Sequence, residues 1–336
     1  EFLMRTEILP LGSDSLARAK ELLLAGELVA FPTETVYGLG ADARSDAAVE
    51  NIYRVKGRPS DNPLIVHVHK DYDLSLLVED DRSYAAKLRE AFLPGPLTLV
   101  YKSRGRVSAK VSCGLDTLAV RVPSHPSAQE FLKYVGIPVA APSANISKHV
   151  SPVSAQHVYD DLHGKIPLIL DGGACSGGIE STVCDVTGDY PVVLRQGLVS
   201  REMIESVTGK CGLYVPKAGE QVRSPGMKYK HYAPACRTCL FEADEIGKAL
   251  TCFYRNRDAG MRVLILCEEA AADNFPSDSV LRLGNTAEEM AANLYALLRD
   301  AETKADMLIA VKPHARGGVM DGVLNRLCKA CAGEEK

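Results

Sequence analysis

The decapeptide Phe-Pro-Thr-Glu-Thr-Val-Tyr-Gly-Leu-Gly, residues 31–40, follows directly on the apolar residues 28–30. An apolar run that ends at a proline predicts a buried strand entering a loop, and this loop carries threonine hydroxyls and glycines. Its Gly38-Leu39-Gly40 resembles part of a dinucleotide-binding fingerprint, but the first glycine lies six residues beyond Pro32 instead of in a strand-to-helix turn. The segment therefore indicates a strand followed by a ligand loop of another kind.

Strands and helices alternate on both sides of this segment. A helix is predicted at 13–25, and a second helix, capped by Ser45, ends near the Lys-Gly-Arg-Pro sequence at 56–59. Further strands are predicted at 64–68, 97–102, 118–122, 139–141, 168–170 and 183–186. Helices fall between several of these strands, which is typical of the α/β class.

The pattern changes at residues 213–234, which are rich in turn residues and have no apolar period. Beyond them, strands are predicted at 261–266 and 307–311. A capping box is predicted at 286–289, and a last helix at about 319–332. A chain of 336 residues is also long for one core. The predicted organisation is a larger α/β domain at 10–212, a linker or lid at 213–234 and a smaller Rossmann-like α/β domain at 235–336.

Composition limits the class of protein. Apolar residues make up 46% and charged residues 24% of the chain, and the net charge is −4, as in ordinary globular proteins. The acidic total argues against binding of nucleic acid over the whole surface. Because the chain shows no long apolar run and no N-terminal signal sequence, the expected location is the cytoplasm. The ten cysteines would be reduced thiols there.

Three cationic residues are candidate anion ligands. Lys56 and Arg58 flank Gly57 after the second helix, where they either hold phosphate oxygens or form a solvated helix end. Arg121 lies within the apolar strand predicted at 118–122. A buried guanidinium needs an anion, which is either a protein carboxylate or the carboxylate of a ligand.

Imidazole, hydroxyl and amide groups complete this set. In the strand at 62–69, Leu64, Val66 and Val68 share one face, and His67 and His69 share the other. Because no carboxylate or cysteine lies nearby at a metal-ligand spacing, a polar cleft wall is favoured over a metal site. The turns at 141–145 and 177–182 carry further hydroxyl and amide side chains. Together these groups fit a site that positions anionic substrates and stabilises phosphoryl charge.

Five motifs in order along the chain resemble those of the YrdC-like threonylcarbamoyl-AMP synthases. They are Phe-Pro-Thr-Glu-Thr-Val-Tyr-Gly-Leu at 31–39, Lys-x-Arg-Pro at 56–59, Pro-Gly-Pro-Leu-Thr at 94–98, Ala-Pro-Ser-Ala-Asn at 141–145 and Gly-Ile-Glu-Ser-Thr at 178–182. The sequence Ser-Pro-Gly-Met-Lys-Tyr-Lys-His-Tyr-Ala-Pro at 224–234 and the segment after it resemble the long two-domain subfamily. One departure is Lys148, which stands where the family usually has glycine.

The resemblance implies a YrdC-like fold, a twisted α/β sheet around a positively lined cavity. It also implies a nucleotidyltransferase, L-threonylcarbamoyladenylate synthase, in which L-threonine and bicarbonate or CO2 give an N-carboxylated threonine. The carboxylate of this intermediate attacks the α-phosphorus of ATP and releases pyrophosphate. The implied cofactor is the Mg²⁺ that accompanies ATP, with no metal site on the protein. The product would pass to the machinery that makes threonylcarbamoyladenosine in tRNA.

The resemblance also assigns residues to the site. Those expected to hold threonine are Thr35, His67, Arg121, Ser143 and Ser181, with Arg121 on the carboxylate. Those expected around ATP are Lys56, Arg58, Asn62, Thr117, Ala141, Ser151 and Arg195. Those expected to carry the catalytic step are Lys56, Arg58, Ser143 and Asn145, the Lys-x-Arg and Ser-x-Asn set of the family.

The linker suggests a separate hypothesis. Its Met227, Tyr229, His231 and Tyr232 are side chains that a solvated tether does not need. We expect the linker to lie over the bound nucleotide as a lid, with His231 and Tyr232 near ATP, and to exclude water from the adenylate. The alternative is that these side chains only join the two domains.

Two Cys-x-x-Cys pairs, Cys236 with Cys239 and Cys328 with Cys331, stand outside the family pattern. They could bind zinc or form disulfides, but 88 residues lie between the pairs, and inert thiols are the favoured interpretation.

Two other functions are alternatives. An RNA-binding module could use the basic cavity to clamp nucleic acid, but the acidic total and the lack of mixed aromatic and basic runs count against it. A carbamoyl-transfer domain of the hydrogenase-maturation type would bring an acylphosphatase segment and zinc-finger cysteines upstream, and the sequence shows neither.

Overall fold

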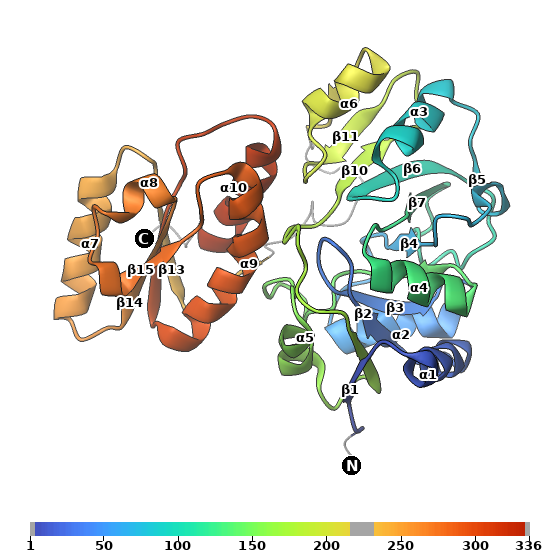
Figure 1. Ribbon diagram of the computed structural model, residues 1–336, viewed down its shortest axis with the longest axis horizontal. Coiled ribbons are helices and arrows are strands. Elements are labelled where there is room, and N and C mark those ends of the chain that lie inside the picture. The colour runs from blue at the N-terminus through green and yellow to red at the C-terminus, as the bar shows by residue number, and fades with distance from the viewer. Residues whose placement is uncertain (1–3, 216–231, 333–336) are drawn as a thin grey trace. The chain divides into compact units, whose positions relative to one another are not determined.

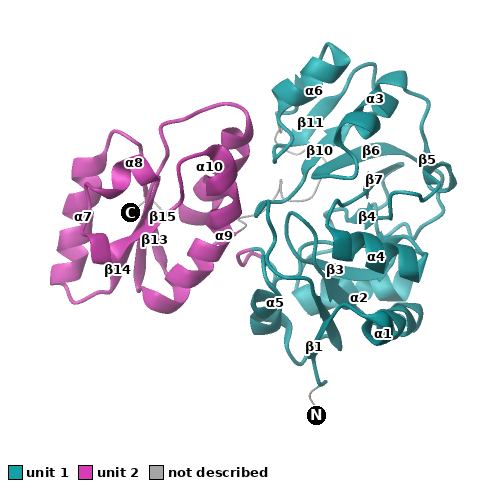
Figure 2. Cartoon of the chain, in the orientation of Figure 1, with its two compact units in different colours: residues 1–147, 151–229 teal, residues 148–150, 230–336 magenta. Residues whose placement is uncertain are grey.

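The computed structural model describes residues 4–215 and 232–332. The chain folds into two compact units (Figure 2), which are unit 1, residues 1–147 and 151–229, and unit 2, residues 148–150 and 230–336. The predicted domain at 10–212 lies in unit 1 apart from residues 148–150, and the predicted domain at 235–336 lies in unit 2. Most of the predicted linker falls outside the described residues.

Unit 1 is built on a mixed sheet with the strand order β1-β9-β2-β3-β8-β4-β7-β6-β10-β11-β12, in which β5 also pairs with β6 (Figure 1). The strands are β1 (Glu7–Pro10), β2 (Val29–Phe31), β3 (Gly38–Asp42), β4 (Ile65–His67), β5 (Val78–Glu79), β6 (Leu97–Ser103), β7 (Thr117–Arg121), β8 (Val139–Ala140), β9 (Leu168–Asp171), β10 (Thr182–Asp185), β11 (Val192–Arg195) and β12 (Gly212–Leu213). The helices are α1 (Ser13–Leu24), α2 (Asp46–Lys56), α3 (Ser83–Phe92), α4 (Pro126–Val135), α5 (Ala155–Leu162) and α6 (Arg201–Thr208).

Local sequence explains where these elements begin and how they pack. Helix α2 begins because the Ser45 hydroxyl accepts a hydrogen bond from the amide of Ala48, and it ends because Gly57 adopts the left-handed region at φ 61°. Helices α1 and α4 pack on β2 through an apolar cluster in which Phe131 contacts Phe31, with ring centroids 4.9 Å apart. This cluster fixes the strand from which the ligand loop departs.

The glycine-rich part of the 31–40 segment is a strand rather than a loop. It forms β3, which is buried and pairs antiparallel with β2. Glycine is usually depleted in strands, but here the neighbouring strands approach too closely for a side chain. A Cβ on Gly40 would lie 2.9 Å from Val139, and a Cβ on Gly38 would lie 3.2 Å from the ring of Phe31. The ligand loop is therefore limited to residues 32–37.

Unit 2 contains a parallel four-stranded sheet in the order β13-β16-β14-β15. Its strands are β13 (Arg237–Phe241), β14 (Val263–Cys267), β15 (Val280–Arg282) and β16 (Met307–Val311), and its helices are α7 (Ile246–Asp258), α8 (Glu269–Ala272), α9 (Ala287–Lys304) and α10 (Val319–Cys331). The predicted capping box starts α9, because Thr286 and Glu289 each accept a hydrogen bond from the other's amide. Parallel strands joined by helices agree with the predicted Rossmann-like arrangement.

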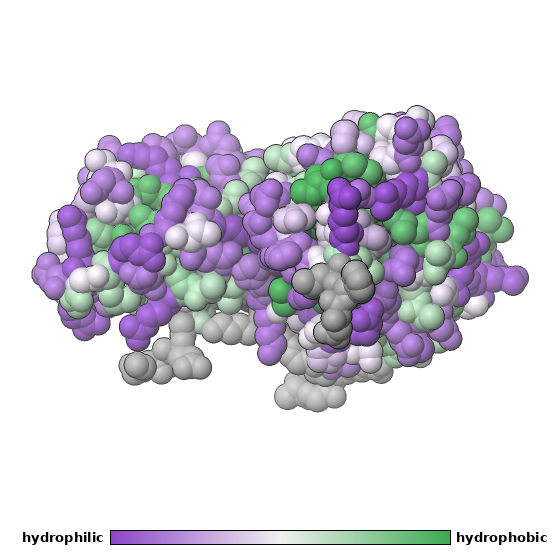
Figure 3. Space-filling model, turned by 90° about the horizontal axis from the view of Figure 1, so that it is seen from below, coloured by the Kyte–Doolittle hydropathy of each residue, from purple (hydrophilic) through white to green (hydrophobic). Residues whose placement is uncertain are grey.

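Within the described part of the chain, no helix combines the length and the apolar character that a membrane span requires. On the face drawn in Figure 3, apolar residues form separate areas between polar ones. Exposed apolar side chains such as Leu24 and Tyr134 are ordinary on folded proteins when they are scattered.

Candidate active site

A row of polar side chains crosses the sheet of unit 1. In the strand register, His67 of β4 lies beside Arg121 of β7, and Arg121 lies beside Thr98 of β6. Paired residues of neighbouring strands point to the same face. The Thr98 hydroxyl is 2.8 Å from that of Ser181, the residue just before β10, and all four side chains are buried. The sheet thus brings three residues of the predicted threonine site together with Thr98, which was not predicted.

Arg121 has both protein partners and an unused donor. Its Nη2 forms an ion pair with Oε1 of Glu34 at 2.5 Å, and its Nη1 donates to the hydroxyl of Thr35 at 2.8 Å. Its Nε is buried and has no hydrogen-bond partner within residues 4–215 and 232–332. Because a buried N–H without a partner is costly, this nitrogen is a donor that a ligand carboxylate can satisfy.

Glu34 is a site residue that the sequence analysis missed. Besides pairing with Arg121, its carboxylate accepts hydrogen bonds from the amides of Ser124 at 2.9 Å and His125 at 3.3 Å. Burial alone would raise the pKa of Glu34, but the charge and hydrogen bond of Arg121 and the main-chain donors hold it below its ordinary value. The carboxylate is therefore ionised at neutral pH and keeps the guanidinium beside the ligand loop.

His67 is neutral in the folded protein. Its Nδ1 lies 3.0 Å from the carbonyl oxygen of Ile65, and its ring packs edge-on against Phe31. Burial, followed by the charge of Arg121, lowers the pKa of His67 to about 3. His69 packs against Tyr72 beyond the end of β4. His69 is thus in a different setting from the buried His67, and a shared face for the two histidines stays a prediction.

We expect His67 to make the protein less stable as the pH falls below 6.5. The unfolded chain protonates this imidazole near 6.5, whereas the folded protein keeps it neutral down to about 3. In this window the unfolded state binds more protons, so the free energy of unfolding decreases with falling pH, by at most about 1.4 kcal/mol per pH unit. Urea unfolding of the wild type and of His67→Asn between pH 5 and pH 7 measures the effect.

The His67→Asn variant should show a shallower slope, because asparagine can keep the hydrogen bond to Ile65 and does not titrate. His69 and His125, whose pKa values burial also lowers, are present in both proteins and cancel in the comparison. Equal slopes in the two proteins would contradict a buried, neutral His67.

Ser181 and Arg195 form a second anchored cluster. The Nε and Nη2 atoms of Arg195 donate to the carbonyl of Ser181 at 3.1 and 2.9 Å, and Nη2 lies 3.2 Å from its hydroxyl. Both residues are buried. A residue predicted for ATP is therefore adjacent to one predicted for threonine.

Lys56 links α2 to the turn at 141–145. It is buried, and its ammonium group donates to the main-chain carbonyls of Ser143 and Asn145, with the side-chain oxygen of Asn145 at 3.5 Å. Burial, and then the charge of Arg58, lower the pKa of Lys56 well below its usual value. The Lys-x-Arg and Ser-x-Asn motifs are thus in direct contact, with Lys56 as the link.

Several predicted ATP residues lie at the other end of the strands that carry His67 and Arg121. Asn62 is buried just before β4, where its carbonyl accepts a hydrogen bond from Arg58 at 2.7 Å, and Thr117 is the first residue of β7. Strands β4 and β7 are parallel, so these residues mark their amino ends. Four residues of strand span roughly 13 Å. Asn62 and Thr117 therefore lie at the opposite end of these strands from His67 and Arg121.

The remaining predicted residues lie in loops near the middle of the sheet. Ser143 forms an isolated bridge with Gly38 of β3, and the amide of Ala141 donates to the carbonyl of Ile65 at 2.9 Å. Ser151 is buried and donates to Oε1 of Glu180 at 2.5 Å.

Two buried acids near Lys56 were not predicted as site residues. Glu180 lies in the predicted 177–182 turn, and Asp161 accepts a hydrogen bond from the amide of Ile146 at 3.1 Å. Both charges oppose the lowering of the Lys56 pKa. Glu180 could have been found as the carboxylate of a polar turn, whereas Asp161 lies on α5 and carries no local signal.

Part of the predicted lid, including His231, lies outside the described residues. Tyr232 belongs to unit 2, is buried, and stacks on Tyr295 of α9 with ring centroids 5.5 Å apart. This stacking gives Tyr232 a packing role in unit 2. Contact of His231 and Tyr232 with ATP stays a prediction.

The two cysteine pairs of unit 2 lie near each other, because burial, and then the charges of Cys236, Cys328 and Cys239, raise the pKa of the Cys331 thiol. Cys239 lies on β13 and packs in the apolar cluster of Phe253 on α7. Cys236 comes three residues earlier, in a bend before the strand begins. Among the described residues, the cysteines are free and no cluster suited to a metal ion is found.

Fold and site together define a class of protein. The fold is a mixed α/β sheet, and its loops and strand ends present lysine, arginine and hydroxyl groups in a buried setting. Such a site suits an enzyme that positions small anionic substrates.

Comparison with known proteins gives the family. The Sua5/YciO/YrdC family model, described as telomere recombination, matches residues 21–197, and the model described as threonylcarbamoyl-AMP synthase, C-terminal domain, matches residues 199–332. The threonylcarbamoyl-AMP synthase of Bacillus subtilis is 42% identical over 336 residues, which cover 98% of this chain and 96% of that protein. The chain therefore belongs to the threonylcarbamoyl-AMP synthase family.

Solved structures agree with this assignment. Pyrococcus abyssi Sua5 complexed with L-threonine matches with a TM-score of 0.88 and 38% identity, covering 98% of this chain and 97% of that chain. A variant of the same protein, with a histidine and the following tyrosine replaced by alanine, matches with a TM-score of 0.89 and 38% identity, covering 97% and 96%. The predicted fold and the long two-domain form are confirmed.

Proposed function

We propose that this protein is an L-threonylcarbamoyladenylate synthase that forms threonylcarbamoyl-AMP from L-threonine, bicarbonate or CO2, and ATP, and releases pyrophosphate. The observation that carries this proposal is the buried Arg121 beside Thr35 and His67, whose Nε has no hydrogen-bond partner among the described residues. The match to a relative solved in complex with L-threonine supports it. The alternative of an RNA-binding module receives no support from these relatives.

Threonine would bind at the carboxyl ends of β4 and β7. Its carboxylate would accept from Arg121 Nε, and its hydroxyl and amine would contact the polar groups of Thr35, Ser143 and Ser181. His67, being neutral, adds a polar wall without a second positive charge. A rigid guanidinium anchored by Glu34 is preorganised for this carboxylate, which reduces the cost of ordering the site on binding.

ATP would lie toward the amino ends of the same strands, among Arg58, Asn62 and Thr117, with Lys56, Ala141, Ser151 and Arg195 around its phosphates and ribose. The contact between Ser181 and Arg195 supports the idea that the two substrates meet there. A carboxylate oxygen of N-carboxythreonine would form a bond to the α-phosphorus, and the bond to the β-phosphate oxygen would break with pyrophosphate leaving. Because the nucleophile is already an anion, the step needs positioning and charge stabilisation rather than a general base.

Mg²⁺ would enter bound to ATP. It is held in many sites by one or two carboxylates together with substrate phosphates, and the buried acids Glu180 and Asp161 near Lys56 fit that donor set. Bound Mg²⁺ would neutralise phosphate charge. We also propose that the protein works in the cytoplasm and passes its adenylate to the tRNA threonylcarbamoyl-transfer machinery, because its product is labile in water.

The reaction itself is the first test. Pyrophosphate release from MgATP should require both threonine and bicarbonate, and omission of either should reduce it to background. Replacing threonine by serine should lower kcat/KM by about 10–200-fold, because the two substrates differ by one methyl group. Equal turnover with serine or glycine would contradict the proposed pocket, and release that ignores bicarbonate would contradict the reaction.

A further inference from the structure

Three residues from the middle of unit 1 belong to unit 2. They are Lys148, His149 and Val150, called here the strap, and Figure 2 draws them in the colour of unit 2. The strap separates two parts of the candidate site. Before it, the carbonyl of Asn145 accepts from Lys56, and after it Ser151 donates to Glu180.

Two side chains from one turn of helix α9 bond to the strap. Nε2 of His149 lies 2.8 Å from Oε2 of Glu302, and Nη2 of Arg299 donates to the carbonyl of Val150 at 2.5 Å. Arg299 and Glu302 are three residues apart, so they project from the same side of the helix. The carbonyl of Lys148 accepts from the amide of Ala233 at 3.1 Å.

These contacts are buried. Val150 is fully buried and Arg299 is 5% exposed, while the side chains of His149 and Glu302 are 23% and 13% exposed. Glu302 also accepts from the amide of Ala235 at 3.1 Å. Burial alone would raise the pKa of Glu302, but the hydrogen bond and charge of His149 and the other donors hold it below its usual value. The pair therefore resembles an interior contact more than a surface ion pair.

The strap backbone is held in an unfavourable conformation. Lys148 has φ 73°, in the left-handed region that a side chain disfavours and glycine adopts freely. A residue stays in this region when its surroundings determine its conformation. In the part of the chain that the structure describes, the strap is held by the hydrogen bonds from α9 and from the amide of Ala233.

We infer that Arg299 and Glu302 are positioning residues for the reaction, which hold the strap and thereby fix Asn145 and Ser151 on either side of it. This inference rests on the proposed function, since both flanking residues are assigned to the adenylate-forming site. A displacement of about 1 Å in a positioned group can cost about 100-fold in rate. The second unit thus contributes to catalysis without supplying a group that touches substrate.

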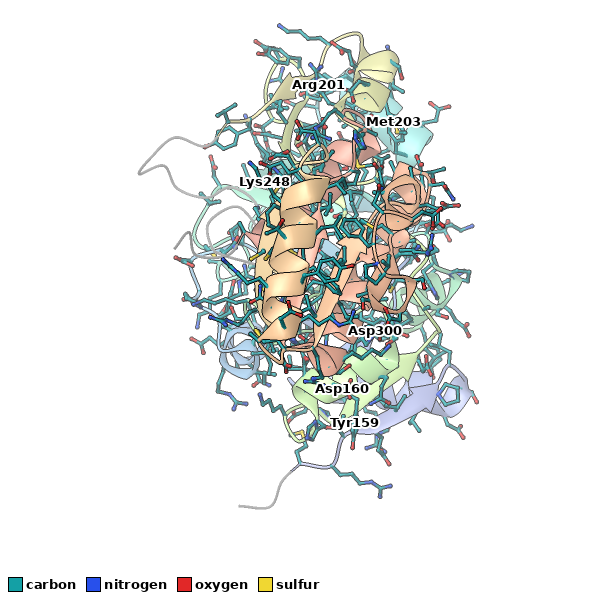
Figure 4. All side chains as sticks on the ribbon, turned by 90° about the vertical axis from the view of Figure 1, so that its left-hand side faces the viewer. Tyr159, Asp160, Arg201, Met203, Lys248 and Asp300 are labelled. Atoms are coloured by element: carbon teal, nitrogen blue, oxygen red, sulfur yellow. The ribbon has the colours of Figure 1, made fainter. Side chains whose placement is uncertain are left out.

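Two variants and one control test this inference in the full chain. Glu302→Gln keeps the shape of the side chain and removes the charge that faces His149, and Arg299→Met keeps the stem and removes the donor to Val150. The control is Asp300→Asn, on the same helix and labelled in Figure 4, because Asp300 pairs with Lys304 at 2.9 Å through side chains that are more than half exposed. Loss of such a pair should change little.

We expect kcat for pyrophosphate release to fall about 10–100-fold in both variants, while threonine affinity measured by calorimetry stays within about 2-fold, because the threonine residues are held by the sheet. Hydrogen exchange of the amides at 146–151 should become faster in both variants and stay unchanged in Asp300→Asn. Arg299→Lys should restore part of kcat, because lysine can still donate to the Val150 carbonyl.

His149→Leu keeps the inference falsifiable if a change in α9 unfolds unit 2. It removes the nitrogen that contacts Glu302 and leaves the helix intact, so it should also lower kcat and speed exchange at 146–151. Unchanged kcat in Glu302→Gln and Arg299→Met, or losses in them that His149→Leu does not share, would overturn the inference. If the wild type released no pyrophosphate, the proposed function would fail. Unchanged exchange at 146–151 in the variants would separately show that α9 does not hold the strap.

Discussion

Replacing Arg121 by methionine should lower kcat/KM for threonine by about 30–1,000-fold, equivalent to about 2–4 kcal/mol of lost transition-state stabilisation. The unpartnered Nε would no longer be present to bind the carboxylate, and the Thr35 hydroxyl would lose the donor at 2.8 Å. The free energy of unfolding should fall as well, by about 3–5 kcal/mol, because Glu34 would remain as a buried carboxylate without its cation. Steady-state kinetics in threonine and in ATP, together with urea unfolding, measure both effects.

A second substitution separates the two effects. In Arg121→Met with Glu34→Gln the buried charge is removed along with its partner, so most of the stability should return, since replacing both members of a buried pair is often nearly neutral. Threonine binding should not return, because the donor is still absent. If the double variant regained threonine binding, or if Arg121→Met raised the KM for ATP alone, the assignment of Arg121 to the threonine carboxylate would be wrong.

Local signals predicted much of the fold. The apolar run before Pro32, the Ser45 cap and the Thr286–Glu289 capping box each depend on neighbouring residues, and each appears in the structure as expected. The strand predicted at 307–311 has the same bounds in the structure. Such elements can be predicted because their causes lie within a few positions of the sequence.

Strand β3 could not be predicted in this way. Glycine has a low strand propensity, and the reason for Gly40 is the Val139 side chain, which is nearly a hundred positions away in the sequence. A local rule interprets glycine as flexibility, whereas the structure uses it for close packing of strands.

The candidate site shows the same limit. Arg121 was expected to need an anion, but the sequence left open whether the protein or the ligand supplies it. The structure shows Glu34 as a protein partner, and within the part of the chain that it describes Nε makes no hydrogen bond. Thr98 ends the motif at 94–98 but was not assigned to the site, because its role comes from strand register, and Asp161 was missed because its role comes from packing.

Lys56 was predicted as a phosphate ligand, and its geometry adds a second role. Two of its three donors are used on the carbonyls of Ser143 and Asn145, and the third points to the Asn145 side chain at 3.5 Å, a weak contact that a phosphate oxygen can replace. Lys56 therefore holds the Ser-x-Asn turn in this structure. Its flanking partner Arg58 donates to the Asn62 carbonyl and is less buried.

Replacing Lys56 by methionine should lower kcat by about 100–1,000-fold, as expected when a donor that organises the reacting groups is lost. It should also reduce the free energy of unfolding by about 1–3 kcal/mol for each carbonyl left buried without a partner. Methionine keeps the length of the apolar stem, so lost packing is a small part of the change. Rapid-quench measurement of adenylate formation, urea unfolding and hydrogen exchange at 143–147 test the three consequences.

Arg58→Met is the matched control, because it removes the cation on the other side of Gly57 and leaves the turn attached. It should raise the KM for ATP with little change in unfolding or in exchange at 143–147, since Arg58 donates to the carbonyl of Asn62, outside that turn. Lys56→Met should instead show faster exchange there even without ATP, because the turn has lost its link to α2. A Lys56→Met protein with wild-type stability and exchange, in which only the KM for ATP rises, would show that Lys56 is a phosphate ligand alone.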